Sequence, residues 1–406
     1  MEIFGKSKRK DELGLVFHIG SSSVKGALFY MQKSGIPRII TSFREPMALE
    51  KEVDLNQFLS LTLKSLEIVA SKISKSSFGA PSKIFCVLSS SWYISQTRVI
   101  NLRKNTPFIF TSKLADSLIQ KEISLFQEEY LKKYAHIGNS LRPIEFKNIK
   151  ITLNGYETTK PLDKKTKELE MTVFISLSAE EVLKKIEGTI SKYFSFKEIK
   201  FSSFAMAVFT IVRDMNIHQE NFLLINIGGE ITDIEMVKNN ALRESTSFPL
   251  GHNFMIRGVA TGMGCTLSEA KSFISLFNAG HAEVSIAKKL KPVIAKLKSE
   301  WLNKFQSSLA NLSNDISIPA FVYITVDKDL ADFFSETIKT EQFNQYTLTE
   351  SKFEVIFIGA EALHDLAVLG ESVIREPKLI IDSVYINRFL MHPLHPVLTE
   401  QAAMPI

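Results

Sequence analysis

Hydrophobic and polar residues follow the same order at two widely separated places in this chain, residues 15–43 and 223–248. Each place reads as an apolar strand, Ile-Gly, a short polar turn, and two more strands joined by a Gly or Asn turn. His18 in the first place aligns with Asn226 in the second. Solenoids and propellers repeat about every 20 to 50 residues, so this wider spacing predicts two halves of one architecture. Each half would open with a three-stranded meander.

The first turn of each meander contains the small residues of a phosphate-binding loop. Glycine lets the backbone approach an anion closely, and successive amide groups with small hydroxyls can surround it. Gly20 and Gly228 stand at matching places in the two turns. Either glycine alone would be read as an ordinary turn residue, and only the pairing favours a common phosphate-binding ancestry.

The pattern between the two meanders predicts an α/β layer interrupted by a separate module. Asp54 caps a helix that ends near Gly79, and a buried strand follows at 83–88. Residues 91–177 change character, because they combine β-rich segments with one long helix and a polar stretch at 154–167. We therefore expect an inserted α+β subdomain that adds nothing to the phosphate site. Its elements are expected near 93–102, 112–134, 143–153 and 169–177.

Strands and helices alternate again after this module. Two capping boxes, Ser178 to Glu181 and Thr266 to Glu269, predict the starts of helices. A long basic helix is expected at 283–312, with Pro292 as a kink or restart inside it. The other elements are expected at 198–202, 204–215, 321–326, 330–338, 355–358 and 361–369.

Composition places the chain among soluble globular proteins. Hydrophobic residues make up 45% and charged residues 23% of the chain, and the apolar run at 204–212 is far shorter than the roughly 20 residues that span a bilayer. The net charge of +5 is mild, and the clustered basic and aromatic residues of nucleic-acid proteins are missing. Cys86 and Cys265 have no metal-ligand spacing and fit a reducing compartment. The N-terminus lacks the apolar core of a secretory signal, so we expect a cytoplasmic protein.

Four segments carry a family resemblance. HIGSSSVKGALF at 18–29 and NIGGEITDIEMV at 226–237 resemble the two phosphate motifs of the actin-like ATPase superfamily. SSSWYISQTR at 89–98 and ALRESTSFPLGHNFMIRGVA at 241–260 resemble the branch that contains the bacterial cell-division protein FtsA and the type IV pilus assembly protein PilM. The resemblance implies an α/β fold with two actin-like (RNase H-like) lobes and an inserted subdomain in the first half.

The resemblance also divides the chain into ranges. The first lobe is expected at 13–90 and 178–218, the inserted subdomain at 91–177, and the second lobe at 219–390. A flexible basic N-terminus at 1–12 and a tail at 391–406 would flank them.

Members of this family bind ATP with Mg²⁺ between the lobes, and their motif positions carry over to this chain. Lys25 would meet the phosphate oxygens, and small residues would leave room for them. The implied cofactor-binding residues are Gly20, Ser21, Ser22, Ser23 and Lys25 in the first loop and Gly228, Gly229, Thr232 and Asp233 in the second.

The chain departs from the family where the chemistry is done. His18 and Asn226 stand where the family has aspartates that hold the hydrated cation and orient the attacking water. Each lost unit charge near a cation is worth about 4 kcal/mol at an effective dielectric of about 20. Glu230 replaces a glycine and would place a carboxylate beside the phosphate. Val326 and Asp327 replace the glycine pair of the adenosine pocket, for which Gly359 and Ala360 are substitute candidates.

These departures predict weak binding of ATP, little affinity for Mg²⁺ and weak or absent hydrolysis, so we assign no catalytic residue and no metal ligand. The leading interpretation is an adaptor or scaffold of cell division or type IV pilus assembly. Its partners would be proteins of those machineries at the inner face of the cell membrane, with self-association and peripheral membrane contact as family properties. The tail contains prolines and no basic amphipathic helix, which favours PilM over FtsA.

Two alternative functions remain at this stage. One is an active Mg²⁺-dependent actin-like ATPase that forms filaments. The other is a small-molecule kinase of the wider superfamily, which would need a catalytic aspartate ahead of the second phosphate loop.

Overall fold

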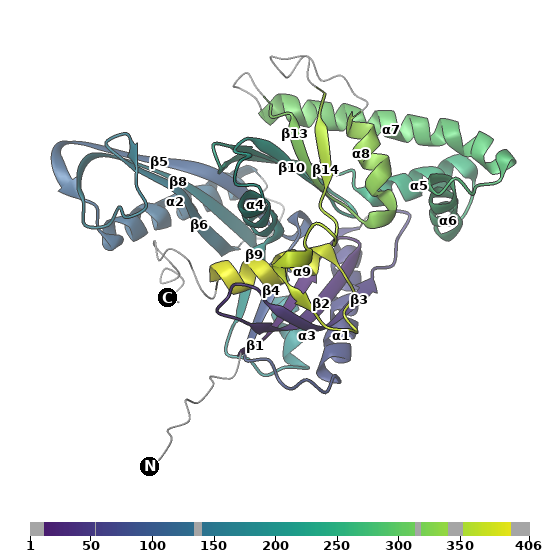
Figure 1. The fold of residues 1–406 in the computed structure, drawn as a ribbon, viewed down its shortest axis with the longest axis horizontal. Helices are drawn as coiled ribbons and strands as arrows, with labels where there is room; N and C mark the ends of the chain where they lie inside the picture. Colours follow the sequence, from purple (N-terminus) through teal and green to yellow (C-terminus); the bar gives the residue numbers. More distant parts are fainter. Residues whose placement is uncertain (1–11, 53, 134–139, 313–317, 340–351, 391–406) are drawn as a thin grey trace, which may run out of the picture.

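Figure 1 shows the computed structural model, in which two α/β lobes lie one above the other and a third module extends to one side. The structure describes residues 12–52, 54–133, 140–312, 318–339 and 352–390. The basic stretch expected at the N-terminus, except for its last residue, and the tail expected at 391–406 lie outside the described residues.

The first lobe is built on a six-stranded sheet in the order β15-β3-β2-β1-β4-β9. The predicted meander is antiparallel, and the next two strands add in parallel because helices or the side module connect them. Asp54 caps α1 as predicted, since its carboxylate accepts from the amide of Gln57 at 2.8 Å. The elements are β1 Glu12–Ile19, β2 Ser23–Met31, β3 Arg38–Pro46, α1 Leu55–Ser74, β4 Lys83–Leu88, the short 3-10 helix η1 Ser90–Trp92, α3 Glu180–Ser191, β9 Ile199–Ser203 and α4 Phe204–Met215.

The second lobe has a five-stranded sheet in the order β12-β11-β10-β13-β14. Its core is centred on Trp301, which is fully buried and stacks on Phe305. The predicted basic helix is a single helix that continues through Pro292. The elements are β10 Phe222–Ile227, β11 Thr232–Lys238, β12 Ala241–Phe248, α5 His252–Met263, α6 Leu267–Asn278, α7 Val284–Leu312, β13 Phe321–Thr325, η2 Lys328–Leu330, α8 Ala331–Lys339 and β14 Glu354–Phe357.

The module at the side is a four-stranded sheet, β5-β8-β6-β7, covered by one long helix. It has a hydrophobic core of its own. A buried carboxylate, Glu145, joins it to the first lobe by accepting from the amide and hydroxyl of Ser203 and from the hydroxyl of Tyr385. The elements are β5 Ile94–Ile109, α2 Ser112–Lys133, β6 Leu141–Leu153, β7 Tyr156–Glu157 and β8 Lys165–Ala179.

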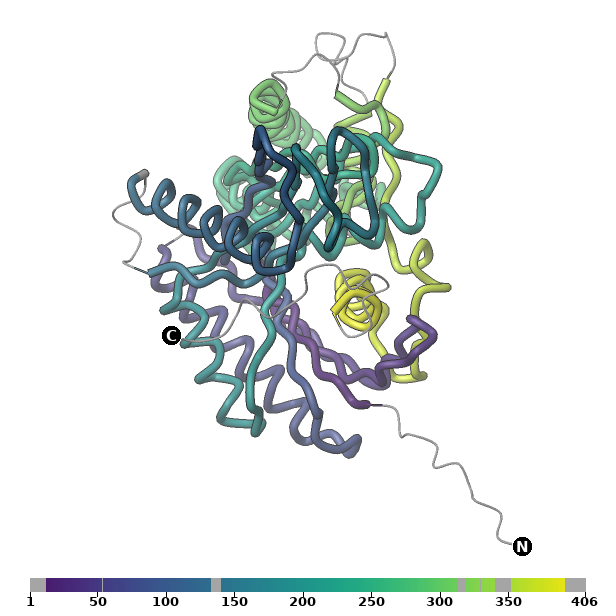
Figure 2. The backbone as a smooth tube through the Cα atoms, turned by 90° about the vertical axis from the view of Figure 1, so that its left-hand side faces the viewer, coloured from purple at the N-terminus to yellow at the C-terminus, as the bar shows by residue number. Residues whose placement is uncertain are grey.

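The last described segment returns to the first lobe. It consists of β15 (Val368–Leu369), α9 (Pro377–Tyr385) and the turn of π-helix η4 (Ile386–Leu390). In Figure 2, α9 is seen nearly end-on between the two lobes, on the face of the first sheet opposite α1 and α3. The second-lobe range of 219–390 is therefore too long at its C-terminal end, because α9 packs into the first core.

Two local predictions are wrong. The expected capping box at Ser178 does not form, because that hydroxyl donates to the carbonyl of Trp92 at 2.6 Å and α3 begins only at Glu180. The expected helix at 361–369 is a short 3-10 helix, η3 (His364–Leu366), followed by β15. Residues 368–369 pair with β3 and so form a strand in place of a helix. The amide of Val368 donates to the carbonyl of Pro37 at 2.9 Å. The capping box at Thr266 is confirmed.

Within the described ranges, no helix is long and apolar enough to cross a membrane.

We predict that Glu145→Ala lowers the free energy of unfolding by about 2 to 4 kcal/mol, because it removes the buried carboxylate that accepts from the amide and hydroxyl of Ser203 and from the hydroxyl of Tyr385. Chemical denaturation of the full chain measures this. Glu157→Ala, at an exposed ion pair of the same module, is the control and should change stability by less than about 0.5 kcal/mol. Equal losses in the two variants would contradict the prediction.

Candidate functional site

The two expected phosphate loops lie directly against each other. The hydroxyl oxygen of Ser21 accepts from the amide of Gly229 at 2.8 Å and from the amide of Glu230 at 3.2 Å. The approach is so close that a Cβ on Gly229 would lie 2.7 Å from the carbonyl oxygen of Ser21. Amides that would bind an anion in the second loop therefore already have an acceptor from the first.

Other backbone groups of the loops form hydrogen bonds within their own lobes. In the first loop the amide of Gly20 donates to the carbonyl of Ser23 at 3.2 Å, and the carbonyl of Ser22 accepts from Met47 at 2.9 Å. In the second, the amide of Gly228 donates to the carbonyl of Ile231 at 2.9 Å. Both turns thus keep the predicted tight conformation.

The carboxylate of Glu230, expected from sequence beside the phosphate, is paired within the second lobe. Its two oxygens accept from both terminal nitrogens of Arg257, at 2.7 and 2.8 Å. The side-chain amide of Asn253 donates to the same carboxylate at 2.7 Å. A bidentate pair of this kind neutralises the carboxylate and fixes its direction toward α5.

Lys25 is buried, and its charge is already paired. Its ammonium lies 3.0 Å from a carboxylate oxygen of Glu376, whose other oxygen accepts from Arg44 at 2.8 Å. Arg44 also reaches Asp327 at 3.0 Å. Burial would raise the pKa of Asp327, but Lys25 and other cations, including Arg44 and Lys378, hold that pKa well below its usual value. The four groups form a continuous ion-pair chain between the lobes.

Asn226 is the centre of a second polar cluster. Its amide nitrogen donates to Asp233 at 2.9 Å, and the hydroxyl of Ser90 donates to the same Asp233 oxygen at 2.7 Å. The amide oxygen of Asn226 accepts from the hydroxyl of Thr325 at 3.0 Å and from the ammonium of Lys378 at 3.1 Å. Burial lowers the pKa of Lys378 to about 8.

His18, like Asn226, contacts a side chain of helix α9. Its Nδ1 lies 2.9 Å from a carboxylate oxygen of Asp382, and both side chains are buried. The imidazole also meets the ring of Phe204 edge-on, with centroids 5.0 Å apart. Burial lowers the pKa of His18 well below, and raises the pKa of Asp382 well above, the ordinary values.

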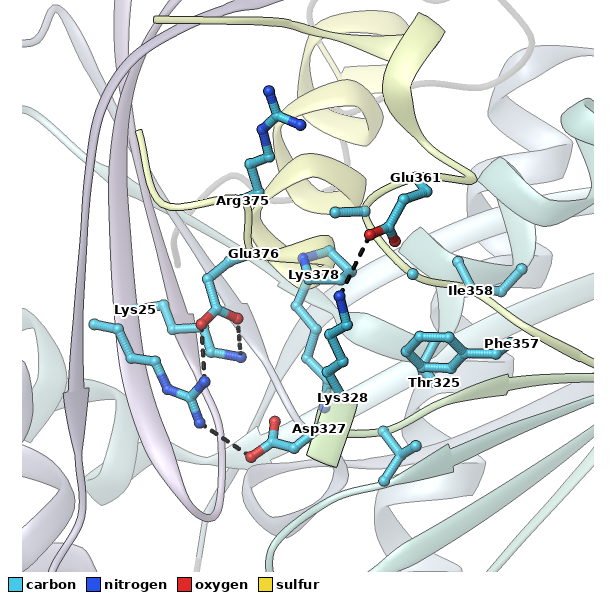
Figure 3. Close-up of a pocket in the computed structure, with 15 residues that line it drawn as sticks. Lys25, Thr325, Asp327, Lys328, Phe357, Ile358, Glu361, Arg375, Glu376 and Lys378 are labelled. Atoms are coloured by element: carbon cyan, nitrogen blue, oxygen red, sulfur yellow. Dashed lines mark hydrogen bonds and ion pairs between the residues drawn. The ribbon is translucent and has the colours of Figure 1, made fainter. Parts of the chain in front are cut away.

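A cavity of about 250 Å³ remains beside these clusters. The ends of β13 and β14 line it, so Val326 and Asp327 lie opposite Gly359 and Ala360. Figure 3 shows Lys25 and Glu376 on one side of the cavity, Lys378 at its centre, and the 3.4 Å contact of Lys328 with Glu361 on the other side.

The sequence-predicted residues are only partly brought together. Ser21 and Gly229 meet, Lys25 lines the cavity, and Asp233 lies beside Asn226. Thr232 is directed into the second lobe, where its hydroxyl donates to the carbonyl of Leu250 at 2.7 Å. In the part of the chain that the structure describes, no group of three or more His, Cys, Asp or Glu side chains could hold a metal ion.

Sequence reasoning missed the residues that α9 and its neighbours contribute. A signal for this helix is present, because Pro377 at its first turn precedes buried Leu379, Ile380 and Val384. The missed residues are Arg44, Ser90, Glu376, Lys378 and Asp382.

Comparison with solved structures identifies the architecture. A chain of the PilM-PilN type IV pilus biogenesis complex superposes with a TM-score of 0.57 at 14% identity, covering 95% of this chain and 99% of that one. The chain therefore has the two-lobed actin-like fold that the motifs implied.

Two other solved structures are similar at lower TM-scores, and they carry no further argument. EutJ, the ethanolamine utilization protein from Carboxydothermus hydrogenoformans, has 10% identity, coverage of 94% of this chain and 91% of that one, and a TM-score of 0.41. MreB 5 of Spiroplasma citri bound to AMPPNP has 8% identity, coverage of 93% and 96%, and a TM-score of 0.44. No protein-family model matches the sequence, and no curated protein sequence matches it.

His252, beside the second loop, generates a pH prediction. Burial lowers its pKa from 6.5 to about 4, and its Nδ1 is buried without a hydrogen-bond partner among the described residues. Between these values the unfolded chain binds more protons than the folded one, so stability falls as pH falls. We expect the free energy of unfolding of wild type to fall by about 1.4 kcal/mol for each pH unit below 6.5 because of this group, and by about 3 kcal/mol in all at pH 4.

The measurement compares wild type with His252→Gln by chemical denaturation across this pH range. The stability difference between the two proteins should change with pH in the stated direction. His364→Gln, at a histidine that is 72% exposed, is the control and should follow wild type. A constant difference between wild type and His252→Gln would contradict the prediction.

Proposed function

We propose that this chain is an actin-like adaptor or scaffold that does not hydrolyse ATP. The observation that carries the proposal is the contact of Ser21 with the amides of Gly229 and Glu230, which closes the two loops on each other. In a nucleotide-binding cleft of this architecture, those amides would face the phosphates. A triphosphate could enter only if the loops separated and Ser21 gave up both hydrogen bonds.

The charges of the cleft support the same proposal. Lys25, which would attract phosphate, is neutralised by Glu376, and this carboxylate would itself repel an anion. His18 and Asn226 offer an imidazole and an amide, whereas Mg²⁺ prefers anionic oxygen. Asn226 in addition already accepts two hydrogen bonds. These residues do not fit Mg²⁺ with ATP, so we derive no catalytic step.

The likeness to a chain of the PilM-PilN complex suggests the biological setting. On this proposal the protein belongs to the cytoplasmic side of a type IV pilus assembly machinery and docks on a protein component of that machinery at the inner membrane. A role in cell division is the alternative setting. On this proposal the membrane contact belongs to the partner protein.

The nucleotide test is a titration of wild type with a fluorescent ATP analogue, with and without Mg²⁺, together with a phosphate-release assay. We expect no saturable binding and no turnover, because the anion and cation positions are taken. The triple variant His18→Asp, Asn226→Asp, Glu230→Gly should gain affinity that depends on Mg²⁺, since it restores two carboxylates and removes one. Measurable Mg²⁺-dependent phosphate release by wild type would overturn the proposal.

The adaptor test uses inverted membrane vesicles from the host cell. We expect the purified chain to bind untreated vesicles and to lose binding after protease removes exposed membrane proteins, because docking is assigned to a protein. Vesicles from cells that lack the pilus assembly genes distinguish the two settings. Loss of binding to them supports pilus assembly, and unchanged binding supports cell division. Equal binding to pure lipid vesicles would contradict protein-mediated docking.

A further inference from the structure

Helix α9 supplies a partner to each of the two residues that replace the expected aspartates. Lys378 and Asp382 are four residues apart, so they lie on the same face of the helix. The ammonium of Lys378 donates to Asn226 at 3.1 Å, and the carboxylate of Asp382 lies 2.9 Å from His18. One turn of α9 thus supplies the partners of both His18 and Asn226.

The charge at this place changes with the residues. Two aspartates would supply two negative charges toward a divalent cation, whereas the imidazole of His18 and the amide of Asn226 supply none. A divalent cation would lose those two charges, and the ammonium of Lys378 brings only one positive charge into the buried cluster.

The surroundings of Lys378 are those of a bound cation. Asp233, Asp327 and Asp382 favour its charged form, and burial and Lys25 oppose it. The ammonium also lies 5.2 Å from the ring centroid of Phe204, within the range of a cation–π contact. The carboxylates come from the second lobe and from α9, so the ammonium links these two parts of the structure.

We propose that the ammonium of Lys378 takes the place of a bound divalent cation and holds the two lobes together. The inference rests on the proposed function, because it explains how the cleft stays closed when no metal nucleotide is bound. It assigns to Lys378 a positioning role, with no part in a chemical reaction.

The experiment compares the melting temperatures of full-length wild type and Lys378→Ala, each with and without ethylammonium chloride or MgCl₂. Choline chloride at equal ionic strength controls for salt. The variant removes three methylene groups and the ammonium, and so leaves room for a small organic cation. We expect its melting temperature to fall by about 5 °C or more and to recover in ethylammonium or Mg²⁺ but not in choline. Wild type should not respond to any of the three.

Two further variants separate charge from packing. Lys378→Met fills most of the volume without the charge, so it should stay destabilised and should not recover in ethylammonium. Lys328→Ala removes an 81% exposed lysine of the same cavity and should behave as wild type. If Lys378→Ala does not fold alone, its refolding yield with ethylammonium against choline becomes the readout, and an equal yield counts against the proposal.

The outcomes are distinct from those of the nucleotide test. The proposal that Lys378 replaces a divalent cation would be overturned by either of two results. One is a Lys378→Met variant as stable as wild type, and the other is a wild type that Mg²⁺ stabilises. Mg²⁺-dependent ATP hydrolysis by wild type would overturn the proposed function, even where the Lys378 variants behave as expected.

Discussion

Charge neutrality inside the interlobe cleft is the constraint on which the rest of this structure depends. Ionised groups that leave water need a partner, because the low local dielectric makes an unpaired charge very costly. The chain of Lys25, Glu376, Arg44 and Asp327 meets this demand without any ligand. In a nucleotide-binding member of the same architecture, phosphate and metal would meet part of it.

Helix α9 adds two further charged side chains to the cleft, Lys378 and Asp382. Through Asp382 it reaches the first lobe, through Lys378 the second, and through Tyr385 the inserted module at Glu145. A short helix therefore contacts both lobes and the inserted module. Its apolar side chains pack in the first core, and its buried polar contacts add strong geometric preferences. We infer that the lobes move little about this helix.

The comparison with solved structures shows how far a shared fold constrains function. The superposition at a TM-score of 0.57 establishes the arrangement of strands and helices, and the sequence identity is only 14%. Function lies in the site, and here His18 and Asn226 stand where the resemblance implies aspartates. The fold is held by its sheets and cores, so it can persist when the side chains of the site change.

The sequence by itself determined the parts of this protein that depend on local pattern. The two meanders, the cap at Asp54, the long helix through Pro292 and the tight turns at Gly20 and Gly228 follow from periodicity and turn chemistry, which act between near neighbours. The substitutions at His18 and Asn226 were also visible, and they pointed to an altered site.

Tertiary structure alone decided what replaced the missing groups. Asp382 is 364 residues from His18 and Lys378 is 152 residues from Asn226, so no local pattern could connect them. The same holds for Glu230, whose charge looked unpaired until α5 brought Arg257 to it. The expected helix at 361–369 was lost to pairing with β3 for a similar reason. Long-range pairing of charges and strands depends on which elements meet in space, and only the folded chain specifies that.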